Sequence, residues 1–254
     1  MAMSADAAQF QAAHFDATTC KVVGATNWIS GLLGFPLNAL QIIQLCGAPS
    51  GSTITLTEKL AWTHAELPDG EQVPLGLLIT VSNDAYLEEP NEFVIYLDGH
   101  INAASIYLKL IMFNDSHKGI AGHMVSLIAA AANTILPGGG TKLRLFAAGG
   151  RNWADMPPSA KASGTVRRWG GYVAWPKYGF DMALLPATGV MARDFPYYPA
   201  GVAGCPNVSD VIDLKGGPEY WRCVGDGDYM NFDLKAGSQS RVRLDALMAN
   251  WRPK

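Results

Sequence analysis

The sequence lacks the features that would assign it at once to a metal-binding, nucleic-acid-binding or membrane-spanning class. Its four cysteines form no CxxC pair, so buried thiols are expected instead of a structural zinc site. Cys205 and Cys223 lie in one loop-rich region, where both free thiols and a disulfide remain open. The formal net charge is −3, which gives no chain-wide positive field for nucleic acid or an anionic membrane.

Common catalytic signatures and targeting signals are also missing. There is no GxSxG elbow, no glycine-rich phosphate loop with a GK pair and no HExxH zinc helix. The first ten residues have neither a basic start nor an apolar run, so no signal peptide is expected and cytoplasmic action is the default. Residues 27–46 are the stretch that comes nearest to a membrane segment, but Asn38, Gln41 and Gln44 predict a buried or amphipathic helix that begins near Pro36.

A strand, a polar turn and a helix follow one another in residues 106–134. Residues 106–113 are branched and aromatic, which predicts a strand, and the spacing of apolar residues from Ile120 onward predicts a helix. The first backbone N–H groups of such a helix are unpaired and favour an anion. Lys118 adds positive charge, and Gly119 and Gly122 leave room for close approach, so an anion site is expected here.

Further strands are predicted on both sides of this segment, at residues 53–60, 73–81, 93–97, 142–148 and 229–234, with a closing helix at 241–251. Tight turns between the early strands favour antiparallel pairing. We therefore expect an α/β (α+β) fold with a mixed, mostly antiparallel central sheet flanked by helices. A helical segment at the N-terminus and a loop-rich segment at the C-terminus would pack on this core as one compact domain, with divisions at 1–52, 53–185 and 186–254.

Two motifs resemble the GNAT superfamily of N-acetyltransferases. Ser116, Gly119 and Ala121 stand at the positions of its acyl-coenzyme A pyrophosphate loop, with serine in place of the usual arginine or glutamine. Downstream, GGYVAWPKYGFDM at residues 170–182 is similar to a short helix that these enzymes carry. With Ala147-Ala148-Gly149-Gly150 before it, the second motif also resembles acetyltransferase-like modules of phage-associated and bacterial effector proteins.

The resemblance implies a cofactor site and a catalytic mechanism. The sheet would part beside Phe113, so that the pantetheine arm pairs with the strand edge while helix amides face the diphosphate. The implied cofactor-binding residues are Leu110, Ile111, Met112, Phe113, Lys118, Gly119, Ile120, Ala121 and Gly122. The family's glutamate base falls at about Ser105 and its tyrosine acid at Trp175, so Tyr107, Tyr172 and Trp175 are the catalytic candidates.

The resemblance thus implies an acyl-CoA-dependent N-acyltransferase that uses acetyl-CoA or another acyl-CoA, with an effector or toxin role among the expectations. The acceptor would be an amine of a protein or a small molecule. The alternative is a catalytically inactive GNAT-like module that binds a partner or belongs to a phage or secretion assembly. The substitutions at Ser116 and Trp175 favour the inactive module, and the intact glycine turn favours the enzyme.

Overall fold

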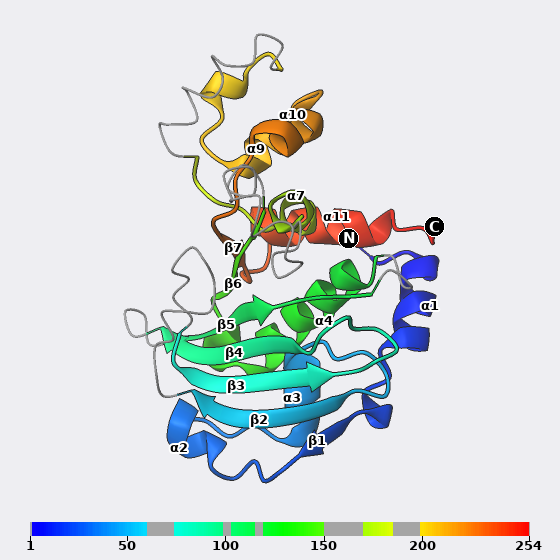
Figure 1. The fold of residues 1–254 in the computed structure, drawn as a ribbon, viewed down its shortest axis with the longest axis vertical. Helices are drawn as coiled ribbons and strands as arrows, with labels where there is room; N and C mark the ends of the chain where they lie inside the picture. The colour runs from blue at the N-terminus through cyan, green and yellow to red at the C-terminus, as the bar shows by residue number, and fades with distance from the viewer. Residues whose placement is uncertain are drawn as a thin grey trace, which may run out of the picture. The chain divides into compact units, whose positions relative to one another are not determined.

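The computed structural model describes residues 2–59, 74–98, 103–114, 119–149, 170–184 and 199–253. Its strands form a seven-stranded mixed sheet in chain order, flanked by helices (Figure 1). This confirms the predicted α/β class with a mixed sheet. The strands are β1 (Lys21–Val23), β2 (Thr53–Lys59), β3 (Gly76–Ser82), β4 (Asn91–Asp98), β5 (Ala103–Leu110), β6 (Lys142–Phe146) and β7 (Tyr229–Asp233).

The chain divides into two compact units. The first comprises residues 1–144 and 233–254, and the second comprises residues 145–232. The chain therefore leaves the first unit within β6 and returns to it within β7. The predicted division into residues 1–52, 53–185 and 186–254 stays a prediction. It is drawn from the part of the sequence that resembles a known family, whereas the two units are defined by packing.

Helices cover the sheet in the first unit. They are α1 (Ala5–His14), η1 (Ala17–Thr19), α2 (Ile29–Leu33), α3 (Ala39–Leu45), α4 (Ile120–Ile135), η2 (Pro137–Gly139) and α11 (Gln239–Ala249). β1 pairs with β2 in parallel, and β2 to β5 form an antiparallel meander. Helices α3 and α4 lie together on one side of this meander (Figure 1).

Alternation along the strands gives the sheet one strongly apolar face. The register sets Leu56 of β2 opposite Ile79 of β3, and Ile79 opposite Phe93 of β4. Phe93 in turn lies opposite Leu108 of β5. Ile79, Phe93 and Leu108 are buried. Such a row of apolar side chains requires a covering layer to keep it from water.

Helix α3 begins three residues later than predicted, at Ala39 and not near Pro36. Asn38 and Gln41 form a capping box there, in which each side chain accepts the other residue's backbone N–H at 2.9 Å. This reciprocal pair satisfies two N–H groups and fixes the helix start. The helix ends as predicted before Gly47, which packs against α4.

The second unit has its own small core. It contains α7 (Gly171–Ala174), η3 (Trp175–Tyr178), η4 (Val202–Gly204), α9 (Val208–Asp213) and α10 (Gly217–Val224), together with the adjoining parts of β6 and β7. Val208, Val211 and Trp221 are buried in this core. The Trp221 indole N–H donates to the Tyr172 carbonyl at 2.8 Å and ties α10 to α7.

Several predicted features differ from the structure. The central strand ends at Leu110 and not at Phe113, which forms only an isolated bridge with Leu87. All four cysteines are free thiols; Cys46 is buried as expected, Cys20 and Cys205 are half-buried, and Cys223 is exposed. The expectation of buried thiols is therefore wrong for Cys223, which lies near the end of α10.

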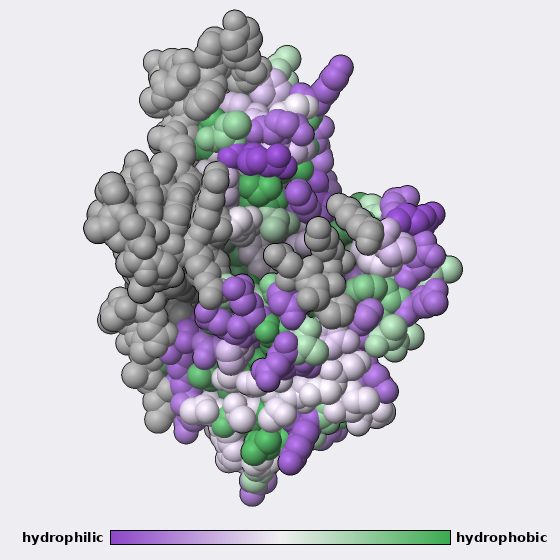
Figure 2. Space-filling view, turned by 45° about the vertical axis from the view of Figure 1, so that its right-hand side comes forward, coloured by the Kyte–Doolittle hydropathy of each residue, from purple (hydrophilic) through white to green (hydrophobic). Residues whose placement is uncertain are grey.

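The described surface carries few large apolar side chains. On the face drawn in Figure 2, hydrophobic patches are small and separated by polar residues. Among the described residues, no helix has both the length and the apolar character needed to cross a bilayer.

Gly47 is required where α3 meets α4. Its φ is +53°, and a Cβ placed there would lie 2.9 Å from both Cγ and the carbonyl oxygen of Met124. We expect Gly47→Ala to lower the free energy of unfolding by roughly 2 to 4 kcal/mol, since it adds this overlap to left-handed strain. Gly51→Ala, at φ +79° with no atom within 4 Å, should cost only about 1 kcal/mol. Urea unfolding followed by circular dichroism compares the two, and equal losses would contradict the role of the contact.

Candidate functional site

A β-bulge interrupts β5 shortly before the strand ends. Leu108 lies opposite Phe93 and Leu110 lies opposite Glu92, so Lys109 is the extra residue on β5. A bulge bends its strand and redirects the side chains that follow, and such irregularities are common beside functional sites. The bulge is therefore the first feature that sets this end of β5 apart.

Beyond the bulge, the chain keeps an extended course but changes its partners. The Met112 N–H donates to the Asn91 side-chain oxygen at 2.7 Å, and the Met112 carbonyl accepts from Glu88 N at 3.1 Å. Asn114 N donates to the Tyr86 carbonyl at 2.9 Å. All three bonds point toward the β4 side of the segment.

Backbone groups alternate in direction along an extended chain, so those of Ile111 and Phe113 point to the opposite side. Within the described part of the chain, no hydrogen bond is made by either residue's main chain on that side. The segment Leu110 to Phe113 therefore presents a strand edge with donors and acceptors at two alternate residues. Such an edge can pair with an extended amide-bearing molecule.

An ion pair and a buried tyrosine lie beside the bulge. Lys109 Nζ is 2.7 Å from the Glu92 carboxylate, and both side chains are largely buried, at 15% and 24% exposure. Tyr107, on the same strand, is fully buried, and its hydroxyl has no partner among the described residues. A buried hydroxyl without a partner is costly, so it marks a position where a hydrogen-bonding group would be stabilising.

Gly119 begins α4 at an exposed position and has φ +94°, which explains why glycine stands there. Ile120 and Gly122 are buried and Ala121 is half-buried, so the exposed part of this helix start is narrow. The Trp251 indole nitrogen lies 3.0 Å from where a Gly119 Cβ would stand. The helix start thus combines backbone N–H groups with a nearby indole N–H donor.

His123 follows in the next turn and is enclosed by aromatic rings. Its ring stacks on Phe10 at 4.6 Å between centroids and meets Trp251 edge-on at 4.7 Å. The side chain is fully buried, and neither ring nitrogen has a partner within the described residues. Burial, and to a lesser extent nearby His14, lowers the pKa of His123 to about 4, so the ring is neutral at pH 7.

The remaining catalytic candidates have structural contacts. Ser105, at the expected place of a base, shares a 2.6 Å hydrogen bond with the Thr141 hydroxyl. In the second unit, the Tyr172 hydroxyl donates to the Arg222 carbonyl at 2.7 Å. Trp175 packs edge-on against Tyr178 and Phe180. Catalytic roles for Tyr107, Tyr172 and Trp175 stay predictions.

The predicted cofactor residues fall into two groups. Leu110, Ile111, Met112 and Phe113 belong to the strand edge, and Gly119, Ile120, Ala121 and Gly122 belong to the helix start. Ser116 and Lys118 lie outside the described residues.

Sequence reasoning missed the Glu92–Lys109 pair and the rings around His123. A charged residue within an otherwise apolar strand was the available signal for Lys109. No signal identified Trp251, because it is 128 positions from His123 in the chain.

Comparisons with known proteins identify no relative of this chain. No protein-family model, curated protein or solved structure matches it. Within the described residues, no group of three or more histidine, cysteine, aspartate or glutamate side chains could hold a metal ion.

The buried His123 predicts a specific loss of stability in acid. Its pKa is about 4 in the folded protein and about 6.5 when unfolded, so between these values only the unfolded chain takes up the proton. Stability should be fully present above pH 6.5 and fall as the pH drops to 4, by on the order of 3 kcal/mol. Urea unfolding at pH 7, 5.5 and 4 measures this loss.

His123→Leu should remove most of that pH dependence, because no titrating ring remains at the buried position. His14→Gln is the comparison, and it should remove only the smaller contribution. An unchanged pH dependence in His123→Leu would contradict the assignment.

Proposed function

We propose that the chain is an acyl-CoA-dependent N-acyltransferase that transfers an acetyl or other acyl group to an amine of a protein or small molecule. The observation that carries the proposal is the strand edge at Ile111 and Phe113, which follows a β-bulge and precedes the glycine-started helix α4. The pantetheine arm of coenzyme A has amides suited to a strand edge. Its diphosphate suits the unpaired N–H groups of a helix start.

The residues at the start of α4 fit the diphosphate of such a cofactor. Gly119 is exposed and has no side chain, and the Trp251 indole N–H lies beside it as an additional donor. The helix dipole adds roughly half a positive charge at this position. An acyl-CoA would supply the thioester, and the chain would hold the diphosphate and align the pantetheine.

The chemistry of transfer requires the amine to lose a proton and the thioester oxygen to be stabilised. Glu92 is a carboxylate beside the bulge, but Lys109 is paired with it at 2.7 Å. The Tyr107 hydroxyl can donate to a developing negative charge, provided that the acyl group reaches its buried position. Holding the amine and thioester together would contribute most of the acceleration.

The second candidate is a GNAT-like module that binds a partner without catalysis, including one in a phage or secretion assembly. It is favoured by the full burial of Tyr107 and by the involvement of Glu92 in an ion pair. Neither Tyr107 nor Glu92 is then an accessible acid or base. Binding of acetyl-CoA and turnover with an amine acceptor separate the two candidates.

The helix start is tested by isothermal titration calorimetry with acetyl-CoA. The wild-type chain should bind, and Gly119→Glu should bind at least roughly tenfold more weakly, because it adds a negative charge and bulk beside the diphosphate. Gly24→Glu is a matched control, since Gly24 has φ +98° and no atom within 4 Å of its Cβ position. It adds the same charge and similar backbone strain elsewhere. No heat of binding by the wild-type chain up to about 0.5 mM acetyl-CoA would defeat the enzyme proposal.

The strand edge is tested by a pair of substitutions at Phe113. Phe113→Pro removes the outward N–H and the ring, whereas Phe113→Ala removes the ring alone. If the cofactor pairs with this edge, the proline variant should bind acetyl-CoA roughly fivefold more weakly than the alanine variant. Circular dichroism checks that both variants fold, and equal affinities would argue against pairing at Phe113.

A further inference from the structure

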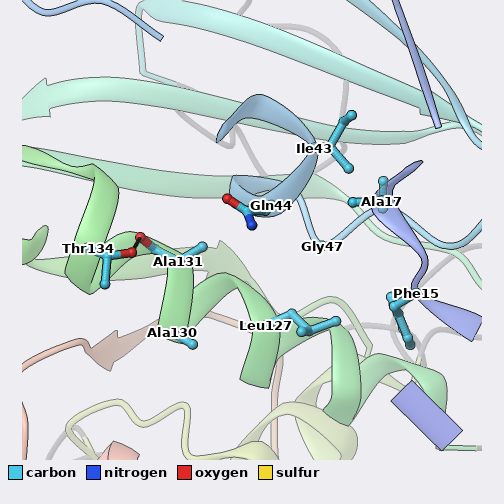
Figure 3. Close-up of a pocket in the computed structure, with 10 residues that line it drawn as sticks. Phe15, Ala17, Ile43, Gln44, Gly47, Leu127, Ala130, Ala131 and Thr134 are labelled. Carbon is cyan, nitrogen blue, oxygen red and sulfur yellow. Dashed lines mark hydrogen bonds between the residues drawn. The ribbon is translucent and has the colours of Figure 1, made fainter. Parts of the chain in front are cut away.

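A pocket of about 390 Å³ lies between α3 and α4, on residues that the proposed acyl-transfer site does not use. Figure 3 shows Phe15 and Ala17 near one end, Thr134 at the other and Gln44 above α4. The described residues that line the pocket are Phe15, Ala17, Ile43, Gln44, Gly47, Ala48, Leu127, Ala130, Ala131 and Thr134. The volume lies within the range of small-molecule sites.

Small side chains create this hollow. Ala130 and Ala131 are adjacent on α4, and Gly47 allows α3 to approach α4 closely. Ile43 and Leu127 provide apolar walls beside them. The floor is therefore apolar, and its shape follows from the same contact that holds the two helices together.

None of the ten lining residues carries a charge. An ionised ligand would lose its hydration without gaining a partner, so carboxylates, phosphates and ammonium groups are disfavoured. The polar side chains are Gln44 and Thr134. The Thr134 hydroxyl donates to the Ala131 carbonyl at 3.0 Å, so it offers a ligand only acceptor lone pairs. The Gln44 amide is the other polar group, and it carries an acceptor oxygen together with two N–H donors.

We infer that this pocket binds a small, uncharged, mainly apolar molecule with one hydrogen-bond donor at the Gln44 and Thr134 end. An aromatic body suits the opposite end, where Phe15 offers a ring for packing. A small molecule is favoured over a second protein because the pocket is concave. Its walls are α3, α4 and the residues Phe15 and Ala17. A flat protein surface would leave this volume unfilled.

The neutral fluorophore N-phenyl-1-naphthylamine is a suitable probe, because it has an aromatic body and one N–H donor. Its fluorescence should rise saturably on binding to the wild-type chain with one site per chain. Ala131→Phe fills the pocket and should weaken binding at least roughly tenfold. Ala8→Phe adds the same ring at an exposed position of α1 and should bind the probe as the wild type does. Circular dichroism and thermal unfolding check that both variants fold.

The hydrogen-bonding end is tested with the N-methylated probe, which lacks the donor. The N–H probe should bind the wild-type chain roughly threefold to tenfold more tightly than the methylated one, and Gln44→Leu should reduce this ratio. Absence of saturable binding up to about 100 µM, or equal binding to Ala131→Phe and Ala8→Phe, would overturn the inference. So would sedimentation data showing a dimer that Ala131→Phe abolishes and the probe does not displace, since the surface would then join two copies of the chain.

Discussion

Helix α4 carries no aspartate, glutamate, lysine or arginine along its sixteen residues, so its stability depends on apolar burial against the rest of the first unit. Met124, Ile128 and Ala132 lie on its buried side. Gly47 lets α3 approach α4 closely, since a methyl group there would overlap with Met124 at 2.9 Å and crowd Ile128 at 3.1 Å. Apolar burial of this helix is the constraint from which the other features follow, because one rigid element supplies the Gly119 start, the buried His123 and the wall of the pocket.

The bulge at Lys109 imposes a second, local constraint on the end of β5. An extra residue costs regular ladder bonds, and two side chains compensate for the loss. Asn91 is almost fully buried and accepts the Met112 N–H, while Glu92 pairs with Lys109. The strand can therefore leave the regular ladder while it remains held on its β4 side. That combination produces the outward edge at Ile111 and Phe113.

Local sequence signals predicted the elements well and their environments poorly. The apolar spacing from Ile120 and the glycine before it correctly located the start of α4, because both signals act within one helical turn. The predicted end of β5 was wrong. Branched and aromatic residues continue past Leu110, so the sequence pattern gives no stop there. The bulge that precedes the end depends on pairing with Glu92, which is distant in the sequence. The ring cluster around His123 brings together Phe10 and Trp251, and no local pattern encodes such a long-range contact.

The two candidate sites on α4 would select ligands of opposite character, because the electrostatic field differs between the two ends of the helix. The partial positive charge of a helix is concentrated in its first turn, where Gly119 and Ile120 lie. Ala131 is eleven residues beyond Ile120, about 16 Å at the helical rise, and lies near the C-terminal end of α4, where the partial charge of the helix dipole is negative. An anion is therefore stabilised at the Gly119 end alone, whereas the uncharged wall at Ala131 favours neutral apolar surface. One helix can thus contribute to both sites, and neither ligand would compete for the other ligand's site.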